Sequence, residues 1–168
     1  MGKARELSEI ISACKTVFGI SDIAELPEKL EKVDNEMFQA FSAAIDLDAE
    51  PIQKIYQYWM ADRETAKQDF TPPSLARLVA SLLGNEKQVY DCCAGCGSLT
   101  IALHRINPTT EFVCDEKDEI VLPFLLFNLA LHNVKAIVRQ IDVLSGEIIK
   151  CFTINPGDKY ASITSGNI

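Results

Sequence analysis

The sequence predicts an α/β protein, because short apolar runs alternate with helical patterns through the second half of the chain. The runs at 88–91, 111–115 and 136–142 have the length of strands, and helical periodicity separates them. This strand–helix–strand–helix–strand order is typical of a doubly wound, mostly parallel sheet, since parallel neighbours need a crossover connection. Ligands of such sheets bind beyond the carboxyl ends of the strands.

The first 69 residues have apolar side chains at helical spacing and indicate three helices. The first stops at Gly19, the second is centred on Phe41, and the third opens with Pro51 near its first position. The apolar positions are Leu7, Ile10, Ile11, Cys14, Val17 and Phe18, then Met37, Phe38, Phe41, Ala44 and Ile45, then Ile52, Ile55, Tyr56, Trp59 and Met60. We therefore expect a helical region at 1–69 and a sheet-containing domain at 70–168.

Two further helices of the second domain are predicted with their ends. Thr71 can cap a helix that stops at Gly84 and tolerates two prolines in its first turn. Its expected inner face is Leu75, Leu78, Val79 and Leu82. Pro123 interrupts the apolar helix that runs to His132, so that helix begins later than Asp118 or is kinked.

The composition favours a cytoplasmic, globular protein. The chain has 168 residues, of which 48% are hydrophobic, and no apolar run approaches the roughly 20 residues of a membrane span. The amino terminus lacks the apolar centre of a secretion signal, so the six cysteines are expected to be thiols. A net charge of -8 provides no global field that attracts nucleic acid, so any DNA contact must be local or come from a partner.

The stretch DCCAGCG at 91–97 allows two interpretations. Cys93 and Cys96 form a CxxC pair at the end of a strand and the start of a helix, where a helix dipole lowers a thiol pKa, so a redox dithiol is one possibility. A zinc site would need four ligands, and the other thiols considered, Cys14, Cys114 and Cys151, are scattered, so no metal site is expected.

The second interpretation is a glycine-rich turn that binds a nucleotide-like cofactor. Gly95 and Gly97 permit unusual backbone angles and close approach, and the turn leads into a helix amino terminus. Such folds use an acid about 20 residues further on to bind ribose hydroxyls. Glu116 lies 25 residues after Asp91, and Asp115 is the adjacent alternative; either can instead be a solvated acid of the charged run DEKDE.

Four blocks of the sequence resemble the cofactor half of the adenine-specific N6 DNA methyltransferases, especially the modification subunits of type I restriction systems. The blocks are QDFTPPSLARLVASLL, DCCAGCGSL, DEKDEIVLPFLLFNLALHNV and, more weakly, IDVL. They occur in the family's order and spacing, from residue 68 to about 147. The resemblance implies a partial class I methyltransferase fold, which is Rossmann-like, with S-adenosylmethionine (AdoMet) as cofactor.

The resemblance also implies a role for each site residue. Asp91 and the backbone from Ala94 to Gly97, including Gly95, would face the methionine part, with Cys93 lining the turn. Glu116 would bind the ribose hydroxyls, Asp142 the adenine amino group, and Phe70 with Thr71 would close over the methionine end. Asp142 can alternatively be a polar strand end, and Thr71 a plain helix cap.

The catalytic Asn/Asp-Pro-Pro-Tyr/Phe motif of that family is not found. Asn155-Pro156-Gly157-Asp158 lacks the stacking ring and suits a β-turn between arms at 148–154 and 159–164. Ser165-Gly166-Asn167-Ile168 lacks both prolines. The length fits either a fragment of a longer enzyme or a short methylase-like protein.

We therefore expect an AdoMet-binding, adenine-N6 DNA methyltransferase-like protein whose catalytic motif is missing or degenerate. The alternatives are a non-catalytic AdoMet-binding regulatory module and a CxxC redox protein. DNA would be reached through a partner subunit, and an exposed sheet edge would favour a homodimer or a hetero-oligomer.

Overall fold

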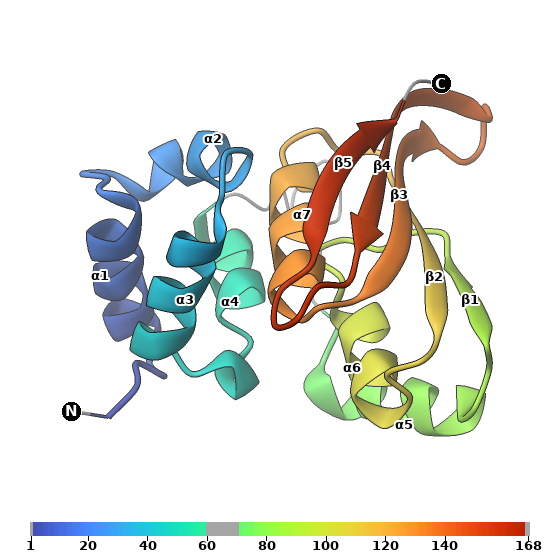
Figure 1. Cartoon of the computed structure of the whole chain (residues 1–168), viewed down its shortest axis with the longest axis horizontal. Coiled ribbons are helices and arrows are strands. Elements are labelled where there is room, and N and C mark those ends of the chain that lie inside the picture. The colour runs from blue at the N-terminus through green and yellow to red at the C-terminus, as the bar shows by residue number, and fades with distance from the viewer. Residues whose placement is uncertain (1, 60–70, 167–168) are drawn as a thin grey trace. The chain divides into compact units, whose positions relative to one another are not determined.

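The computed structural model describes residues 2–59 and 71–166, and it is a mixed α/β structure (Figure 1). The chain divides into two compact units, Met1–Phe70 and Thr71–Ile168. The first is helical and the second contains the sheet.

The first unit is built from short helices around an aromatic and aliphatic core. Its elements are α1 (Leu7–Phe18), η1 (Ile23–Glu25), α2 (Leu26–Leu30), α3 (Asn35–Ala44), η2 (Leu47–Ala49) and α4 (Pro51–Trp59). Gly19 ends α1 with φ 62°, and the rings of Phe18 and Phe41 lie 6.0 Å apart in the core. Trp59, expected in the core, is 47% exposed, and Met60 lies outside the described residues.

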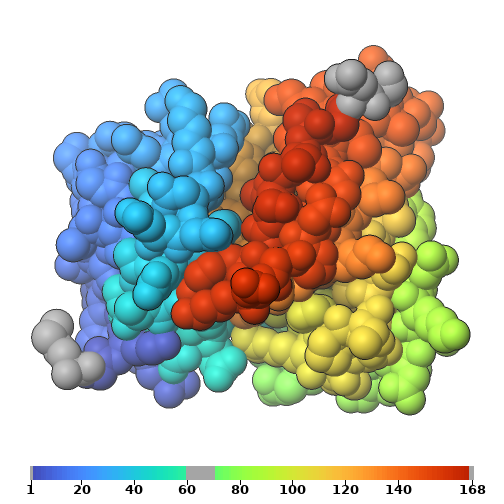
Figure 2. Space-filling view, in the orientation of Figure 1, coloured from blue at the N-terminus to red at the C-terminus, as the bar shows by residue number. Residues whose placement is uncertain are grey.

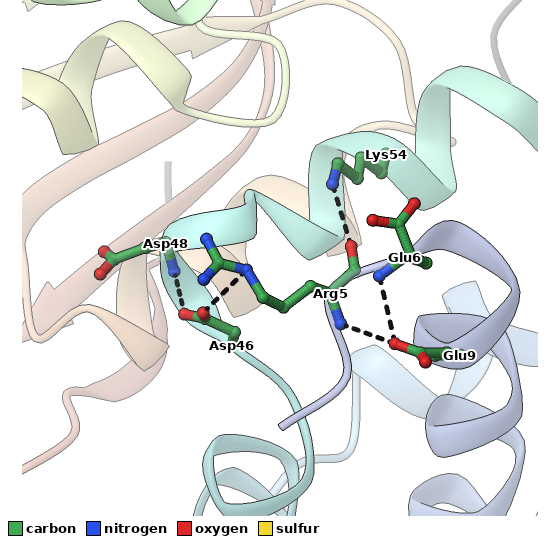
Figure 3. Close-up of polar contacts among 6 residues, drawn as sticks. All are labelled: Arg5, Glu6, Glu9, Asp46, Asp48 and Lys54. Carbon is green, nitrogen blue, oxygen red and sulfur yellow. Dashed lines mark hydrogen bonds and ion pairs between the residues drawn. The ribbon is translucent and has the colours of Figure 1, made fainter. Parts of the chain in front are cut away.

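Polar contacts hold the amino-terminal segment against the α3–α4 connection (Figure 3). Arg5 Nε pairs with Asp46 Oδ2 at 3.3 Å, while Lys54 Nζ donates to the Arg5 carbonyl at 3.1 Å. Glu9 accepts from the backbone amides of Arg5 and Glu6 at the start of α1. The Glu9 carboxylate thus binds backbone amides at the amino terminus of α1, where donors lack an intrahelical partner.

The second unit contains a five-stranded mixed sheet in the order β1-β2-β3-β4-β5. Its elements are α5 (Pro73–Leu83), β1 (Gln88–Asp91), α6 (Ser98–Ile106), β2 (Glu111–Glu116), α7 (Leu122–Leu131), β3 (Lys135–Asp142), β4 (Glu147–Asn155) and β5 (Ser162–Gly166). Strands β1 to β3 are parallel, whereas β4 and β5 pair antiparallel. The expectation of a mostly parallel sheet therefore holds for three strands only, because short turns join β3, β4 and β5.

Helices cover one face of the parallel strands within the described residues. Side chains alternate along β2 and β3, so that Phe112, Cys114, Ala136 and Val138 are buried. Helix α6 lies on that face, where Thr100 Oγ1 is 3.5 Å from Cys114 Sγ. On the opposite face, Tyr90 is 56% exposed and Ile137 is 43% exposed. Figure 2 shows that the β4–β5 hairpin, coloured orange-red to red, lies at the molecular surface.

Helix α5 presents a different face from the one predicted. It buries Ala76 and Ala80, while the expected inner residues Leu75, Leu78 and Leu82 are exposed and Val79 is half-buried. Small residues face inward because α5 packs on α6, and alanine lets two helix backbones approach closely. The cap also differs: Pro72 precedes the helix, and its carbonyl accepts from Ala76 N, so Thr71 lies one residue too early.

Helix α7 starts late, at Leu122, with Pro123 in its first turn, where a missing N–H costs nothing. Every residue of α7 is buried, including Asn128, as is typical of a helix that is apolar all round. Gly97 approaches this helix closely: a β-carbon there would lie 3.1 Å from Leu125 Cδ1 and 3.2 Å from Leu129 Cδ2. Its φ of +85° also disfavours a side chain.

Gly97→Ala is therefore expected to lower the free energy of unfolding by about 2–4 kcal/mol, from backbone strain and overpacking together. Gly146→Ala is the matched control, because Gly146 has φ +77° but a β-carbon at this position would meet no heavy atom within 4 Å. The control should lose only about 1 kcal/mol in urea unfolding. Equal losses in the two variants would contradict the packing argument.

Candidate functional site

Three acids predicted to form the site end the three parallel strands. Asp91 is the last residue of β1, Glu116 of β2 and Asp142 of β3. Because these strands are parallel, their carboxyl ends lie at one edge of the sheet. The glycine-rich loop after β1 lies at the same edge, so the structure places the main sequence-predicted residues together.

Hydrogen bonds fold the glycine-rich loop onto the end of β2. Ala94 N donates to the Asp115 carbonyl at 2.9 Å, and Gly95 N donates to Glu116 Oε2 at 2.9 Å. Gly97 N donates to the Ala94 carbonyl at 2.8 Å. The three amides that were expected to face a ligand thus have partners within the protein, and they hold the shape of the loop.

The loop is also supported from α7 and α6. Buried Asn128 donates from Nδ2 to the Cys96 carbonyl at 2.7 Å, and Thr100 Oγ1 donates to Asp91 Oδ2 at 3.0 Å. The sequence did not identify Asn128 or Thr100 as site residues, because no motif or spacing marks them as partners of the loop. By contrast, a β-carbon at Gly95 would meet no heavy atom of residues 2–59 and 71–166 within 4 Å, so among these residues the loop is open there.

The structure distinguishes Glu116 from Asp115. Successive side chains of a strand point to opposite faces, and Asp115 is fully buried with its carboxylate bound by Arg139 and Tyr90. Glu116 is half-buried and accepts from Gly95 N and Asp118 N. A carboxylate has about four acceptor positions, so Glu116 retains capacity for ribose hydroxyls.

Asp142 has two roles in the structure. Its Oδ1 accepts from Leu144 N at 3.0 Å, which stabilises the turn into β4, and its Oδ2 pairs with Lys117 Nζ at 2.7 Å. The hydrogen bond from Lys117 lowers the pKa of Asp142. Lys117 directly follows Glu116 and was hidden in the run DEKDE. The Lys117 side chain is 73% exposed and that of Asp142 32%, so a ligand can displace this solvent-screened pair at low cost.

Asp91 is a desolvated carboxylate without a cationic partner among the described residues. Burial raises its pKa, while hydrogen bonds from Thr100 and from the amide of Cys93 act in the opposite direction. No ion pair joins Asp91 to a lysine, arginine or histidine within residues 2–59 and 71–166. An arriving cationic group would stabilise its charged form.

The cysteines of the loop are poorly suited to thiolate chemistry. Cys93 is exposed and Cys96 is buried. Burial raises the pKa of both thiols, and the charge of Glu116 raises both further. Nucleophilic cysteines have lowered pKa values, so this environment opposes a redox dithiol. Within the part of the chain that the structure describes, no group of three or more metal-ligating side chains occurs.

The near match to the catalytic motif lies at the wrong end of the sheet. Ile154, next to Asn155, pairs with Ala136 at the amino end of β3, whereas Asp142 is at the carboxyl end. Gly157 exchanges two hydrogen bonds with the Asn133 side chain, at 2.9 and 3.0 Å, which fixes the segment as a turn. Asn155 to Asp158 therefore cannot act on a substrate beside Asp91 and Glu116.

The remaining predicted residues precede α5. Thr71 is half-buried, and Phe70 lies outside the described residues.

No helix of the described part is both long enough and apolar enough to cross a membrane.

The sequence model of the N-6 DNA Methylase family matches residues 43–149, which is more than half of the chain. The chain belongs to the N-6 DNA methylase family. Neither a curated protein nor a solved structure matches it. The match includes the three acids and the glycine-rich loop, and it ends within β4 of this methylase-family protein.

The raised pKa of Asp91 predicts a pH dependence of stability. The pKa of Asp91 is near 3.8 in the unfolded chain and higher in the folded protein. Between these two pKa values the folded state binds more protons than the unfolded state does. The free energy of unfolding therefore falls as pH rises from the unfolded pKa through the folded pKa. Asp91→Asn should remove this loss. We expect the variant to gain stability relative to wild type between pH 3 and pH 7, measured by urea unfolding; a pH-independent difference would contradict the assignment.

Proposed function

We propose that this methylase-family protein binds AdoMet at the carboxyl ends of β1, β2 and β3. The observation that carries the proposal is the joining of the glycine-rich loop to Glu116 by the Gly95 hydrogen bond, with Asp91 at the other end of the loop. Glu116, an acceptor for ribose hydroxyls, and Asp91, an acceptor for a cationic group, thus lie on either side of Gly95. We interpret β1–α6–β2–α7–β3 as a Rossmann-like half on this basis.

The residues present fit AdoMet chemically. Its ribose offers two hydroxyl donors, for which Glu116 retains acceptor positions. Its methionine part carries a positive ammonium group, and Asp91 is a desolvated carboxylate lacking a cationic partner among the described residues. No heavy atom of the described part of the chain would lie within 4 Å of a β-carbon at Gly95, which leaves room for a ligand there. Asp142 would receive the adenine amino group if Lys117 moves aside.

Bound AdoMet would supply an electrophilic methyl group, and the described residues supply its binding. The chain has no Asn/Asp-Pro-Pro-Tyr/Phe motif, and Asn155 to Asp158 is remote from the site. The groups that accept hydrogen bonds from an adenine amine and stack on its ring therefore come, on this proposal, from outside the described residues. A non-catalytic AdoMet-binding module is the second candidate, favoured by the same missing motif.

We propose that DNA is reached through a partner subunit, as in a restriction-modification system. The net charge of -8 opposes direct attraction to phosphates, so a partner would provide the basic contacts. Strands β1 and β5 are the sheet edges within the described residues, and an exposed edge favours pairing with another chain, either a second copy or a different subunit. The six free cysteines suit the reducing cytoplasm.

Calorimetric titration with AdoMet tests the cofactor proposal. Glu116→Gln and Asp91→Ala should each weaken binding by about tenfold or more, since each removes a charged acceptor. Glu111→Gln is the matched control, because Glu111 is an acid at the opposite end of β2 and should bind like wild type. No binding by folded wild type, or equal binding by all four proteins, would refute the site.

Transfer of labelled methyl groups tests the catalytic proposal. We expect no label in DNA when the protein is incubated alone with AdoMet, because the described residues provide no group for the adenine amine. Labelling should appear only when a partner supplies those groups. Transfer by the protein alone would contradict this division, and lack of transfer with every partner that binds it would favour the non-catalytic module.

A further inference from the structure

The buried carboxylate of Asp115 is the centre of an interaction that the cofactor proposal does not use. Arg139 Nε donates to Asp115 Oδ1 at 2.6 Å and Arg139 Nη2 donates to Oδ2 at 2.7 Å. The Tyr90 hydroxyl donates to Oδ2 at 2.6 Å, and the Arg139 guanidinium lies 5.8 Å from the Tyr90 ring centre. The bidentate geometry makes this a strong, directional pair.

This cluster joins all three parallel strands. Tyr90 belongs to β1, Asp115 to β2 and Arg139 to β3, and Asp115 and Arg139 are partners in the strand register. The three side chains lie on the sheet face opposite α6. They cross-link the three strands just before the carboxyl ends, on the sheet face that α6 does not cover.

The cluster directly precedes the proposed cofactor residues. Tyr90 is followed by Asp91, and Asp115 is followed by Glu116. Because successive side chains point to opposite faces, fixing the first residue of each pair also fixes the direction of the second. The Asp115 carbonyl additionally accepts from Ala94 N, so the same residue holds the glycine-rich loop through its backbone.

We propose that Tyr90, Asp115 and Arg139 form a strand clamp that positions Glu116 and the glycine-rich loop for the ribose of AdoMet. The inference rests on the proposed cofactor function. The three are positioning residues, which act through Glu116 and the loop amides of Ala94 and Gly95, and they do not touch the cofactor. Such supporting contacts commonly determine how well a binding residue is oriented.

The same two strands provide a matched control. Lys135 and Glu111 form an ion pair in register between β3 and β2, at the ends of these strands that are remote from the site. Lys135→Met breaks a charged contact between the same strands without touching the clamp. Arg139→Lys keeps the charge that Asp115 needs but loses the two-pronged geometry, and Tyr90→Phe removes only one hydrogen bond from a side chain that is 56% exposed.

The experiment measures AdoMet affinity by calorimetry and hydrogen exchange of the Ala94 and Gly95 amides for wild type and the three variants. We expect Arg139→Lys to weaken affinity by about tenfold and Tyr90→Phe by about threefold, each with faster exchange of the two amides. Lys135→Met should resemble wild type in both measurements. Melting temperatures identify losses of affinity that follow from general destabilisation.

The outcomes test the strand clamp and the cofactor site separately. Wild-type affinity and exchange in both clamp variants would overturn the clamp and leave the cofactor site intact. The clamp would also be overturned if Arg139→Lys and Tyr90→Phe lost no more AdoMet affinity than Lys135→Met does. If wild type itself does not bind AdoMet, the cofactor proposal fails, and the exchange rates alone decide the clamp: faster exchange in Arg139→Lys than in Lys135→Met supports it, and equal rates overturn it.

Discussion

The close approach of the Gly97 backbone to α7 is the constraint on which the candidate site depends. A β-carbon at Gly97 would lie only 3.1 Å from Leu125 Cδ1 and 3.2 Å from Leu129 Cδ2, so these side chains would have to shift. The neighbouring Cys96 carbonyl accepts a hydrogen bond from buried Asn128. The loop therefore rests directly on a helix that is buried along its whole length. In this position the amides of Ala94 and Gly95 donate hydrogen bonds to the end of β2.

The strand pattern could be predicted from sequence because it depends on which residues follow one another along the chain. Apolar runs, glycine stops and the proline of α7 mark element ends directly, and the three parallel strands appear where expected. The buried face of α5 could not be predicted in the same way. Its leucines and alanines both recur at helical spacing, and packing against α6 favours the small Ala76 and Ala80. Hydrophobicity alone predicts the opposite face.

The site could be predicted only as a set of positions in the chain. Motif spacing and the family resemblance located Asp91, Glu116 and Asp142, but the run DEKDE left Asp115 open as an alternative to Glu116. Their difference comes from strand alternation together with the partners Arg139 and Tyr90, which lie 24 and 25 residues away. Contacts such as Lys117 with Asp142 likewise depend on how neighbouring strands end, which periodicity does not determine.

On our proposal, the glycine-rich loop and Glu116 form the two sides of one AdoMet site, although the sequence has no Asn/Asp-Pro-Pro-Tyr/Phe motif. A crystal structure of the protein with S-adenosylhomocysteine tests it most directly. We expect ribose hydroxyls within hydrogen-bond distance of the Glu116 carboxylate, about 2.5–3.0 Å, with the amino acid part beside Asp91. A ligand bound elsewhere, with Glu116 and Asp91 making no contact to it, would refute this site.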